Sequence, residues 1–278
     1  MMSYNLSRRI GLIFLGVLGF FLALLYLSPF YLVIINSFKS KREVVLDTLA
    51  LPEQLLWENY AKALEKLDLF RTFTNSVIIT VGSILLIMML SSMCAWMLVR
   101  TKNKVSTFIF YIFVAGMLIP FQSVMLPLVR FMGEIGMLNS RTGIILMYGG
   151  FGSSMAIFLY HGFIKNIPAE LEQAALIDGC SKWQIYRYIV FPLLRPIHYT
   201  VAILNVLWIW NDYLLPALML QDNAVRTIPL QMQYFFGAYS KDWQLAMAAL
   251  LLSMLPIIIF YLFAQKHIIK GIMAGSVK

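Results

Sequence analysis

Six long stretches of the chain carry few or no charged side chains, and each is about as long as a lipid bilayer is thick. They are residues 10–35, 75–99, 105–129, 142–164, 197–220 and 245–264. A helix needs roughly 20 mainly apolar residues to cross the hydrocarbon layer, where only helices and closed barrels satisfy all of their backbone hydrogen bonds. The sequence therefore predicts an all-α integral membrane protein with six transmembrane helices.

The charged residues agree with this fold class. They make up 13% of the 278 residues, whereas soluble domains carry about 25%. The formal net charge of +9 is typical of a membrane protein whose Lys and Arg gather in cytoplasmic loops. Because no basic cluster is interleaved with aromatic residues, we expect no nucleic-acid partner.

The basic residues also predict an orientation. The short connection between the second and third spans carries Arg100, Lys102 and Lys104, and short loops rich in Lys and Arg stay in the cytoplasm. Both termini and residues 166–195 are then cytoplasmic, while residues 36–73 and 221–243 lie outside. In residues 36–73, charged and apolar residues alternate in a way that predicts an amphipathic helix, although a solvated loop is an equal alternative for residues 40–56.

A polar stretch separates the fourth and fifth predicted spans. Pro168 suits the first turn of a helix, Glu170 and Glu172 suit the positive end of its dipole, and Gly179 can adopt the left-handed conformation that ends it. These residues predict one short helix between two transmembrane segments.

A second helix is expected directly after it. Ser181 followed by Gln184 has the spacing of a capping box, and Pro192 should end or bend the helix. The polar stretch is therefore a helix-turn-helix.

The first of these helices has a face of small residues. Leu171, Ala174 and Ala175 are spaced at i, i+3 and i+4, so they share one side of the helix, which another backbone could approach closely. The spacing fits a docking surface and an ordinary connecting loop equally well.

The helix-turn-helix resembles the EAA loop of ATP-binding-cassette (ABC) importer permeases, most closely those of the carbohydrate-uptake family of the maltose, multiple-sugar and raffinose type. The matching positions are Ala174, Ala175, Asp178, Gly179, Ile189, Pro192 and Pro196. One position departs, since Gln173 replaces the glutamate that gives the loop its name. In that family the loop contacts the ATPase subunits, so the resemblance implies that the coupling residues are Glu172, Gln173, Ala174, Ala175, Asp178, Gly179 and Pro192.

The resemblance extends over most of the chain. An Asn-Tyr pair at residues 59–60, an Asn-Ser pair at residues 75–76 and the basic tail at residues 265–278 are similar to the same family. The tail, which contains Ala-Gly-Ser-Val-Lys, resembles the C-terminal signature of one of the two permeases. Residues 1–278 are thus expected to be a single transmembrane domain that includes the coupling loop at residues 166–195.

The fifth span contains an ionisable residue, Asp212, within the sequence Trp-Ile-Trp-Asn-Asp-Tyr. Such a residue faces a bundle interior or a watery cavity by default, but it can equally brace neighbouring helices through hydrogen bonds. Carbohydrate permeases carry a similar stretch. A sugar stacks its faces on aromatic rings, and its hydroxyl groups need amide and carboxylate partners. The substrate-pathway candidates are therefore Gln122, Tyr148, Asn205, Asn211, Asp212 and Tyr213.

The sequence contains no P-loop motif with its lysine, so we expect no ATPase site in this chain. His161, His198 and His267 are too far apart to form a local metal motif, and we assign no catalytic residue, metal or cofactor to the chain. The resemblance implies that ATP and Mg²⁺ are bound by partner ATPase subunits.

The resemblance further implies a second, different permease, two ATPase subunits, an extracellular or periplasmic sugar-binding protein, and a bacterial or archaeal cytoplasmic membrane. An oligosaccharide is the expected cargo, with glycerol phosphate esters as an alternative. The other class of function is a secondary transporter in which Asp212 couples transport to an ion gradient. We find no internal repeat of the kind that secondary transporters show, and the sequence favours the importer.

Overall fold

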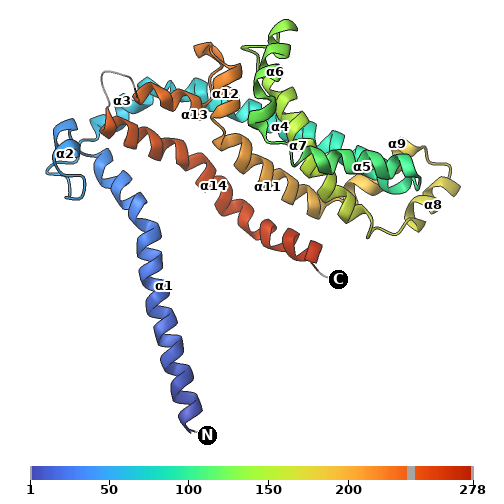
Figure 1. Cartoon of the computed structure of the whole chain (residues 1–278), viewed down its shortest axis with the longest axis horizontal. Helices are drawn as coiled ribbons and strands as arrows, with labels where there is room; N and C mark the ends of the chain where they lie inside the picture. Colours follow the sequence, from blue (N-terminus) through green and yellow to red (C-terminus); the bar gives the residue numbers. More distant parts are fainter. Residues whose placement is uncertain (1, 237–241, 277–278) are drawn as a thin grey trace. The chain divides into compact units, whose positions relative to one another are not determined.

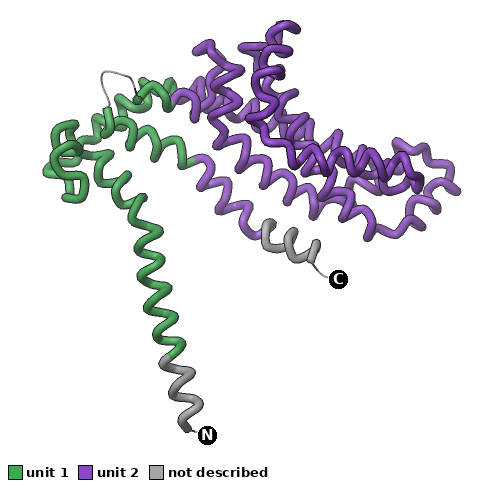
Figure 2. The backbone as a smooth tube through the Cα atoms, viewed as in Figure 1, with its two compact units in different colours: residues 1–68, 232–255 green, residues 69–231, 256–278 purple. Residues whose placement is uncertain are grey.

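The computed structural model describes the backbone of residues 2–236 and 242–276, and the side chains of residues 11–236 and 242–266. The chain forms two compact units (Figure 2). Residues 1–68 and 232–255 form unit 1, and residues 69–231 and 256–278 form unit 2. The side chains of most of the tail at residues 265–278 lie outside the described residues.

Unit 1 contains the long helix α1 (Met2–Ser37), the short helices α2 (Lys41–Leu46) and α3 (Glu58–Leu67), the 3-10 turn η3 (Met232–Phe235) and the first half of α14 (Trp243–Ser276). The amphipathic helix predicted in residues 36–73 is confirmed as α3. Its buried residues, Asn59, Ala63 and Leu67, recur every fourth position, so one side of the helix faces the interior. Residues 40–56 contain α2, which begins at a capping box between Ser40 and Glu43.

The Asn-Tyr pair of α3 holds the end of α1. The Asn59 side-chain amide donates to the carbonyls of Ser37 and Lys39, each at 2.9 Å. The Tyr60 hydroxyl lies 2.7 Å from the Ser37 hydroxyl. These bonds satisfy carbonyl groups that the end of a helix leaves without an internal partner, and they fix the turn that leads from α1 to α2.

Unit 2 is built around α4 (Leu69–Arg100) and α7 (Arg141–Ile164), which pack along each other (Figure 1). Ile79 and Ile87 of α4 and Ile144, Tyr148 and Ile157 of α7 form the centre of its core. Gly152 allows the close approach, because a Cβ atom there would collide with the Ile87 side chain and would lie 2.8 Å from the Asn205 side-chain oxygen.

The other helices of unit 2 surround this pair. They are α5 (Lys104–Gly116), α6 (Phe121–Glu134), α8 (Glu170–Ile177), α9 (Lys182–Ile185), the π-helix η1 (Tyr186–Val190), α10 (Phe191–Leu193), α11 (Arg195–Asn211), α12 (Leu214–Met219), the 3-10 turn η2 (Asn223–Val225), α13 (Ile228–Gln231) and the second half of α14.

The Asn-Ser pair, Asn75 and Ser76, lies in the first part of α4 and binds a distant connection of the chain. The Asn75 amide donates to the carbonyls of Ala224 and Arg226 at 3.0 and 2.9 Å, and the Ser76 hydroxyl accepts the Ile228 N–H at 3.0 Å. Both side chains are buried. They fasten the connection between α12 and α13 to a helix about 150 residues earlier in the chain.

Four of the six predicted spans are continuous helices: Gly11–Ser37, Leu69–Arg100, Arg141–Ile164 and Trp243–Lys266. Two bent pairs, Lys104–Gly116 with Phe121–Glu134 and Lys182–Leu193 with Arg195–Asn211, bring the candidates to six if each pair is one span. The fold class is confirmed, with four to six candidate spans among the described residues.

The predicted span at residues 105–129 is a sharply bent pair of helices, a departure from straight geometry of the kind that its prolines favour. The chain breaks after Gly116, and α5 and α6 meet at 100°. Pro120 is the N-cap of α6 with an extended backbone, and a proline disfavours helical geometry at the residue before it. Apolar composition alone does not reveal this bend.

The predicted span at residues 197–220 is likewise interrupted, shortly before Pro216. Helix α11 ends at Asn211, the backbone is extended at Asp212, and α12 starts at Leu214. Pro216 has no N–H to donate to the Asp212 carbonyl, so a regular helix cannot continue through this point without losing a hydrogen bond.

Candidate functional site

The first helix of the predicted coupling loop is confirmed as α8. It ends in a Schellman motif, in which the Cys180 N–H donates to the Ala175 carbonyl at 2.9 Å and the Gly179 N–H donates to the Leu176 carbonyl at 3.1 Å. Gly179 has a φ of +84°, which glycine adopts without a steric penalty. The turn that the sequence predicts at this glycine is therefore present.

The second helix starts where the sequence predicts. The Ser181 N–H donates to the Gln184 side-chain oxygen at 2.7 Å, and the Gln184 N–H donates to the Ser181 hydroxyl at 3.3 Å. The helix ends one residue after Pro192, close to where the sequence predicts. The helix widens into the π-helix η1, continues through α10, and turns by 74° only after Leu193.

The inner side of α8 holds a buried ion pair. Glu172 is 8% exposed, and one of its carboxylate oxygens accepts from Arg100 Nε at 2.8 Å and forms a 2.7 Å ion pair with Arg100 Nη2. Its other oxygen accepts from Trp96 Nε1 at 2.9 Å. Arg100 also donates to the Ile167 carbonyl at 3.0 Å. These contacts tie α8 to the end of α4.

The predicted face of small residues is only partly correct. Leu171 and Ala174 are exposed, but Ala175 is 7% exposed and belongs to the core of unit 2. The exposed surface of α8 and its C-cap instead consists of Glu170, Leu171, Gln173, Ala174, Leu176, Ile177 and Asp178. Ile177 is 87% exposed, so the helix presents an apolar surface that nothing in the described residues covers.

Two further contacts hold the second helix against the core. The Tyr186 hydroxyl lies 2.7 Å from the Ser92 hydroxyl of α4. His198 Nδ1 lies 2.6 Å from the Tyr160 hydroxyl of α7, and His198 Nε2 lies 3.2 Å from the Phe191 carbonyl. The loop is thus joined to α4 through Tyr186 and to α11 through the Phe191 carbonyl, and the buried His198 side chain in turn joins α11 to α7.

The structure brings together two of the six pathway candidates. The Tyr148 hydroxyl donates to Asp212 Oδ2 at 2.9 Å, and Asp212 Oδ1 accepts the Leu214 N–H at 3.0 Å. The Trp208 ring packs edge-on against Tyr148, with ring centroids 5.4 Å apart. Asp212 therefore braces α7 against the break between α11 and α12.

The other four candidates make no hydrogen bond to this pair among the described residues, although Asn211 and Tyr213 flank Asp212 in the chain. The Asn205 and Asn211 amides donate to carbonyls of their own helix, those of Val201 and Leu207, at 2.8 and 2.7 Å. Asn205 is buried, whereas Gln122, Asn211 and Tyr213 are exposed.

Sequence reasoning did not find the partners of the loop. Arg100 was interpreted only as an orientation signal, and Trp96, Ser92, Tyr160 and His198 were not singled out as loop contacts. Ser92, Trp96 and Arg100 are spaced at i, i+4 and i+8, and this four-residue spacing could have shown that they share one face of α4.

Among the described side chains, no group of three or more His, Cys, Asp or Glu residues could hold a metal ion. His267 lies outside the described side chains.

The fold has a counterpart among solved structures. It is similar to a chain in the crystal structure of a bacterial ABC transporter involved in the import of the acidic polysaccharide alginate, with a TM-score of 0.79 and 24% sequence identity over 93% of this chain and 96% of that chain.

The sequence defines the family. Residues 87–273 match the model of the binding-protein-dependent transport system inner membrane component, and the chain belongs to this family. It is 50% identical to the probable starch degradation products transport system permease protein AmyC of Thermoanaerobacterium thermosulfurigenes, over 95% of this chain and 96% of AmyC. It is 34% identical to the melibiose/raffinose/stachyose import permease protein MelC of Bacillus subtilis, over 98% and 99% of the two chains. The predicted resemblance is confirmed, and the chain is a multi-pass membrane permease subunit.

Proposed function

We propose that this chain is one permease subunit of an ABC importer that moves an oligosaccharide into the cytoplasm by ATP-driven alternating access. The observation that carries the proposal is the 50% identity to a permease named for starch degradation products, over 95% of the chain. Relatives named for multiple-sugar and for melibiose, raffinose and stachyose transport support the same class of cargo.

The proposed complex contains a second, different permease, two ATPase subunits and an extracellular or periplasmic sugar-binding protein. It lies in a bacterial or archaeal cytoplasmic membrane, and both termini of this chain face the cytoplasm. Residues 1–278 act as one transmembrane domain. The sequence lacks a P-loop, so the ATPase subunits bind ATP and Mg²⁺, and this chain supplies no cofactor site.

Membership of a binding-protein-dependent transport family removes the alternative of a gradient-driven carrier. The sugar pathway runs past Tyr148 and Asp212, which the fold places together. The remaining pathway candidates are Gln122, Asn205, Asn211 and Tyr213.

Reconstitution tests the function directly. The full complex in vesicles, with binding protein and internal ATP, should take up malto-oligosaccharides and raffinose-type sugars, and a panel that includes glycerol phosphate diesters ranks the cargo. Binding of the same panel to the isolated binding protein identifies the ligand independently. ATP-independent uptake by this chain alone would overturn the proposal.

The coupling loop transmits closure of the ATPase dimer to the membrane helices as a rigid body. A packed element with two discrete positions can carry such a movement, whereas a mobile loop cannot. The bonds from Glu172 and Tyr186 to α4, and the bond from His198 to α7 just after the loop, support this role. The exposed apolar surface of α8 is the part that meets the ATPase.

Variants on the two sides of α8 test the docking surface. Ala174→Arg adds a long side chain to the exposed side, and should abolish co-purification of the ATPase while the chain still inserts and assembles with the second permease. Ala61→Arg, at an exposed alanine of α3, is the matched control. Ala175→Arg should instead reduce the amount of folded protein, since Ala175 is buried. Wild-type ATPase association and sugar uptake by Ala174→Arg would contradict the docking surface.

Two substitutions at Gly179 test the turn that ends α8. Gly179→Asp places a side chain and a charge at a φ of +84°, although the site itself has free space for a Cβ atom. Asn is among the residues that adopt this conformation most readily, so Gly179→Asn is the control. We expect uptake to fall further in Gly179→Asp than in Gly179→Asn, and equal uptake in the two variants would show that the added charge has no effect.

A further inference from the structure

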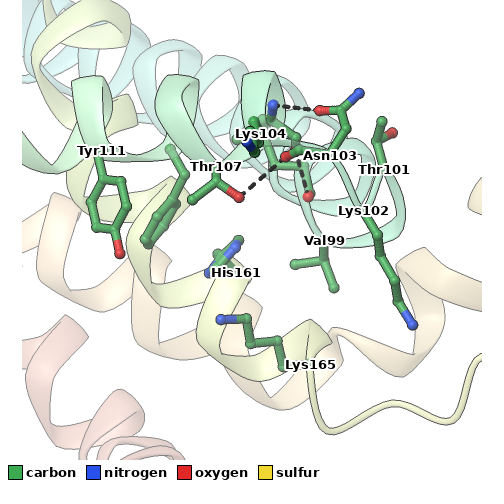
Figure 3. A pocket seen from close by; sticks show the side chains of 12 residues that line it. Val99, Thr101, Lys102, Asn103, Lys104, Thr107, Tyr111, His161 and Lys165 are labelled. Carbon is green, nitrogen blue, oxygen red and sulfur yellow. Dashed lines mark hydrogen bonds between the residues drawn. The ribbon is translucent and has the colours of Figure 1, made fainter.

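A cleft of about 600 Å³ lies where α4 turns into α5, against the last turns of α7 (Figure 3). None of the contacts proposed for sugar transport or for ATPase docking uses it. Its lining comes from the end of α4, the turn at residues 101–103, the first two turns of α5, His161 of α7 and Lys165, which directly follows α7.

The cleft is strongly basic. Lys102, Lys104 and Lys165 line it, and none of the described lining residues is an Asp or Glu. The neighbouring Arg100 is already paired with Glu172, so that carboxylate does not neutralise the three lysines. All three lysines are exposed, and Figure 3 shows Lys165 beside His161, with Lys102 at the side of the cleft.

The polar groups of the turn itself are already occupied. Asn103 Oδ1 accepts the Ser106 N–H at 2.7 Å, the Ser106 hydroxyl donates to the Leu98 carbonyl at 2.7 Å, and the Thr107 hydroxyl donates to the Asn103 carbonyl at 3.2 Å. The ammonium groups of the three lysines therefore provide the attraction for a ligand, and that ligand must be an anion.

The remaining lining is apolar. Val99 and Phe110 belong to it, and the Phe110 ring stacks on His161 with centroids 3.8 Å apart. Beyond the cleft, α5 exposes Phe108 and Ile112, at 65% and 52%. A ligand that fits these surroundings is negatively charged at one end and apolar at the other.

We propose that this cleft binds the phosphate headgroup of an anionic phospholipid, whose acyl chains run along the exposed side of α5. Basic pockets between helices at a membrane surface recognise such headgroups, and the ends of α4 and α7, both candidate membrane spans, place the lysines at that boundary. The simpler reading, that these lysines are solvated charges that only set topology, does not account for the apolar wall beside them.

Lipid capture by the complete transporter tests the site. The complex is purified in detergent after exposure to vesicles of phosphatidylcholine containing a photoreactive phosphatidylglycerol, and the crosslinked peptides are mapped. We expect crosslinks in residues 98–111 and 161–165. The Lys102→Gln/Lys165→Gln variant should retain less phosphatidylglycerol, by about fivefold for each lysine removed, because one basic residue at an anionic surface contributes on the order of that factor.

A matched double variant separates a site from general surface charge. Arg195→Gln/Lys266→Gln removes two exposed positive charges outside the cleft and should retain as much lipid as the wild type. Equal losses in the two variants, or full retention by Lys102→Gln/Lys165→Gln, would overturn the proposal.

A soluble phosphate ester distinguishes the source of the anion. Glycerol phosphate and inorganic phosphate, added in excess, should displace little of the photoreactive lipid, since neither occupies the apolar wall. Complete displacement by either at millimolar concentration would show that the cleft is a site for a free phosphate and would overturn the lipid assignment.

Discussion

Two carboxylates of unit 2, Glu172 and Asp212, are held in different ways. Glu172 is 8% exposed and has a cationic partner, Arg100, together with the Trp96 indole N–H. Asp212 is more accessible, and the two groups that donate to it, the Tyr148 hydroxyl and the Leu214 N–H, are both uncharged. The first lies at the coupling loop, and the second lies at a break between two helices.

The difference shows how each site can serve transport. Separating Glu172 from Arg100 leaves a charge without a partner in a poorly solvated position, which is strongly unfavourable, so α8 and α4 should move together. Hydrogen bonds between a carboxylate and uncharged donors are more easily exchanged for water or for a sugar hydroxyl. Asp212 is therefore the better candidate for contacts that change during transport.

The largest expected effect comes from breaking the Glu172 pair. Glu172→Met leaves Arg100 without its carboxylate and should destabilise the chain by about 3 kcal/mol, as for other buried pairs that lose one partner. Unfolding of the purified chain in detergent measures this. Glu170→Met, at an exposed position of the same helix, should change stability by less than about 0.5 kcal/mol. Similar values for the two variants would show that the ion pair does not hold the loop.

The close packing of α4 and α11 against α7 can be tested at Gly152. Gly152→Ala forces a Cβ atom against the Ile87 and Asn205 side chains, and overpacking of this kind costs about 1–3 kcal/mol. Gly150→Ala is the control on the same helix, because a Cβ atom there meets nothing within 4 Å, and it should be neutral or stabilising. The same unfolding assay compares them, and equal losses would argue against close packing at Gly152.

Two variants of Asp212 distinguish the contribution of its charge from that of its hydrogen bonds. Asp212→Ala removes the acceptor of the buried Tyr148 hydroxyl and should cost about 1–2 kcal/mol. Asp212→Asn keeps an oxygen for that hydroxyl and should cost less than about 1 kcal/mol. Sugar uptake measured alongside stability shows whether the charge itself matters for transport. A cost for Asp212→Asn as large as that for Glu172→Met would remove the contrast between the two carboxylates.

Asp242 of unit 1 is a solvent-accessible carboxylate that pairs with two lysines, and its removal should have the smallest effect on stability. Hydrogen bonds from Lys66 and Lys41, at 3.0 and 3.2 Å, hold the pKa of its carboxyl below the ordinary value. The resulting stabilisation is present above the ordinary aspartate pKa and is lost as the pH falls through the lowered pKa. Exposed pairs contribute up to about 1 kcal/mol.

Stability measured from pH 7 to pH 3 for the wild type and for Asp242→Asn tests this. The wild type should be more stable at neutral pH, and the difference should shrink towards zero in acid and in high salt. A difference that grows on acidification would contradict the sign of the pKa change.

The sequence predicted what depends on neighbouring residues and missed what depends on distant ones. Hydropathy over about 20 residues located four continuous spans, and local spacing located the Gly179 turn and the Ser181 cap. The inward position of Glu172 depends on Arg100, which is 72 residues away. The breaks near Pro120 and Asp212 lie inside apolar runs, where composition alone does not distinguish a continuous span from a bent one.

The π-helical turn at Tyr186–Val190 has a consequence for comparing related loops. Such a turn accommodates one residue more than an α-helix would over the same length, and one residue of an α-helix corresponds to a rotation of about 100°. A relative with a regular α-helix here would therefore need a one-residue gap in its alignment, placed within this turn. Deleting one residue from the turn would let it close as a regular α-helix with Phe191 kept in phase, whereas deleting one residue from α9 would rotate everything after it by about 100°.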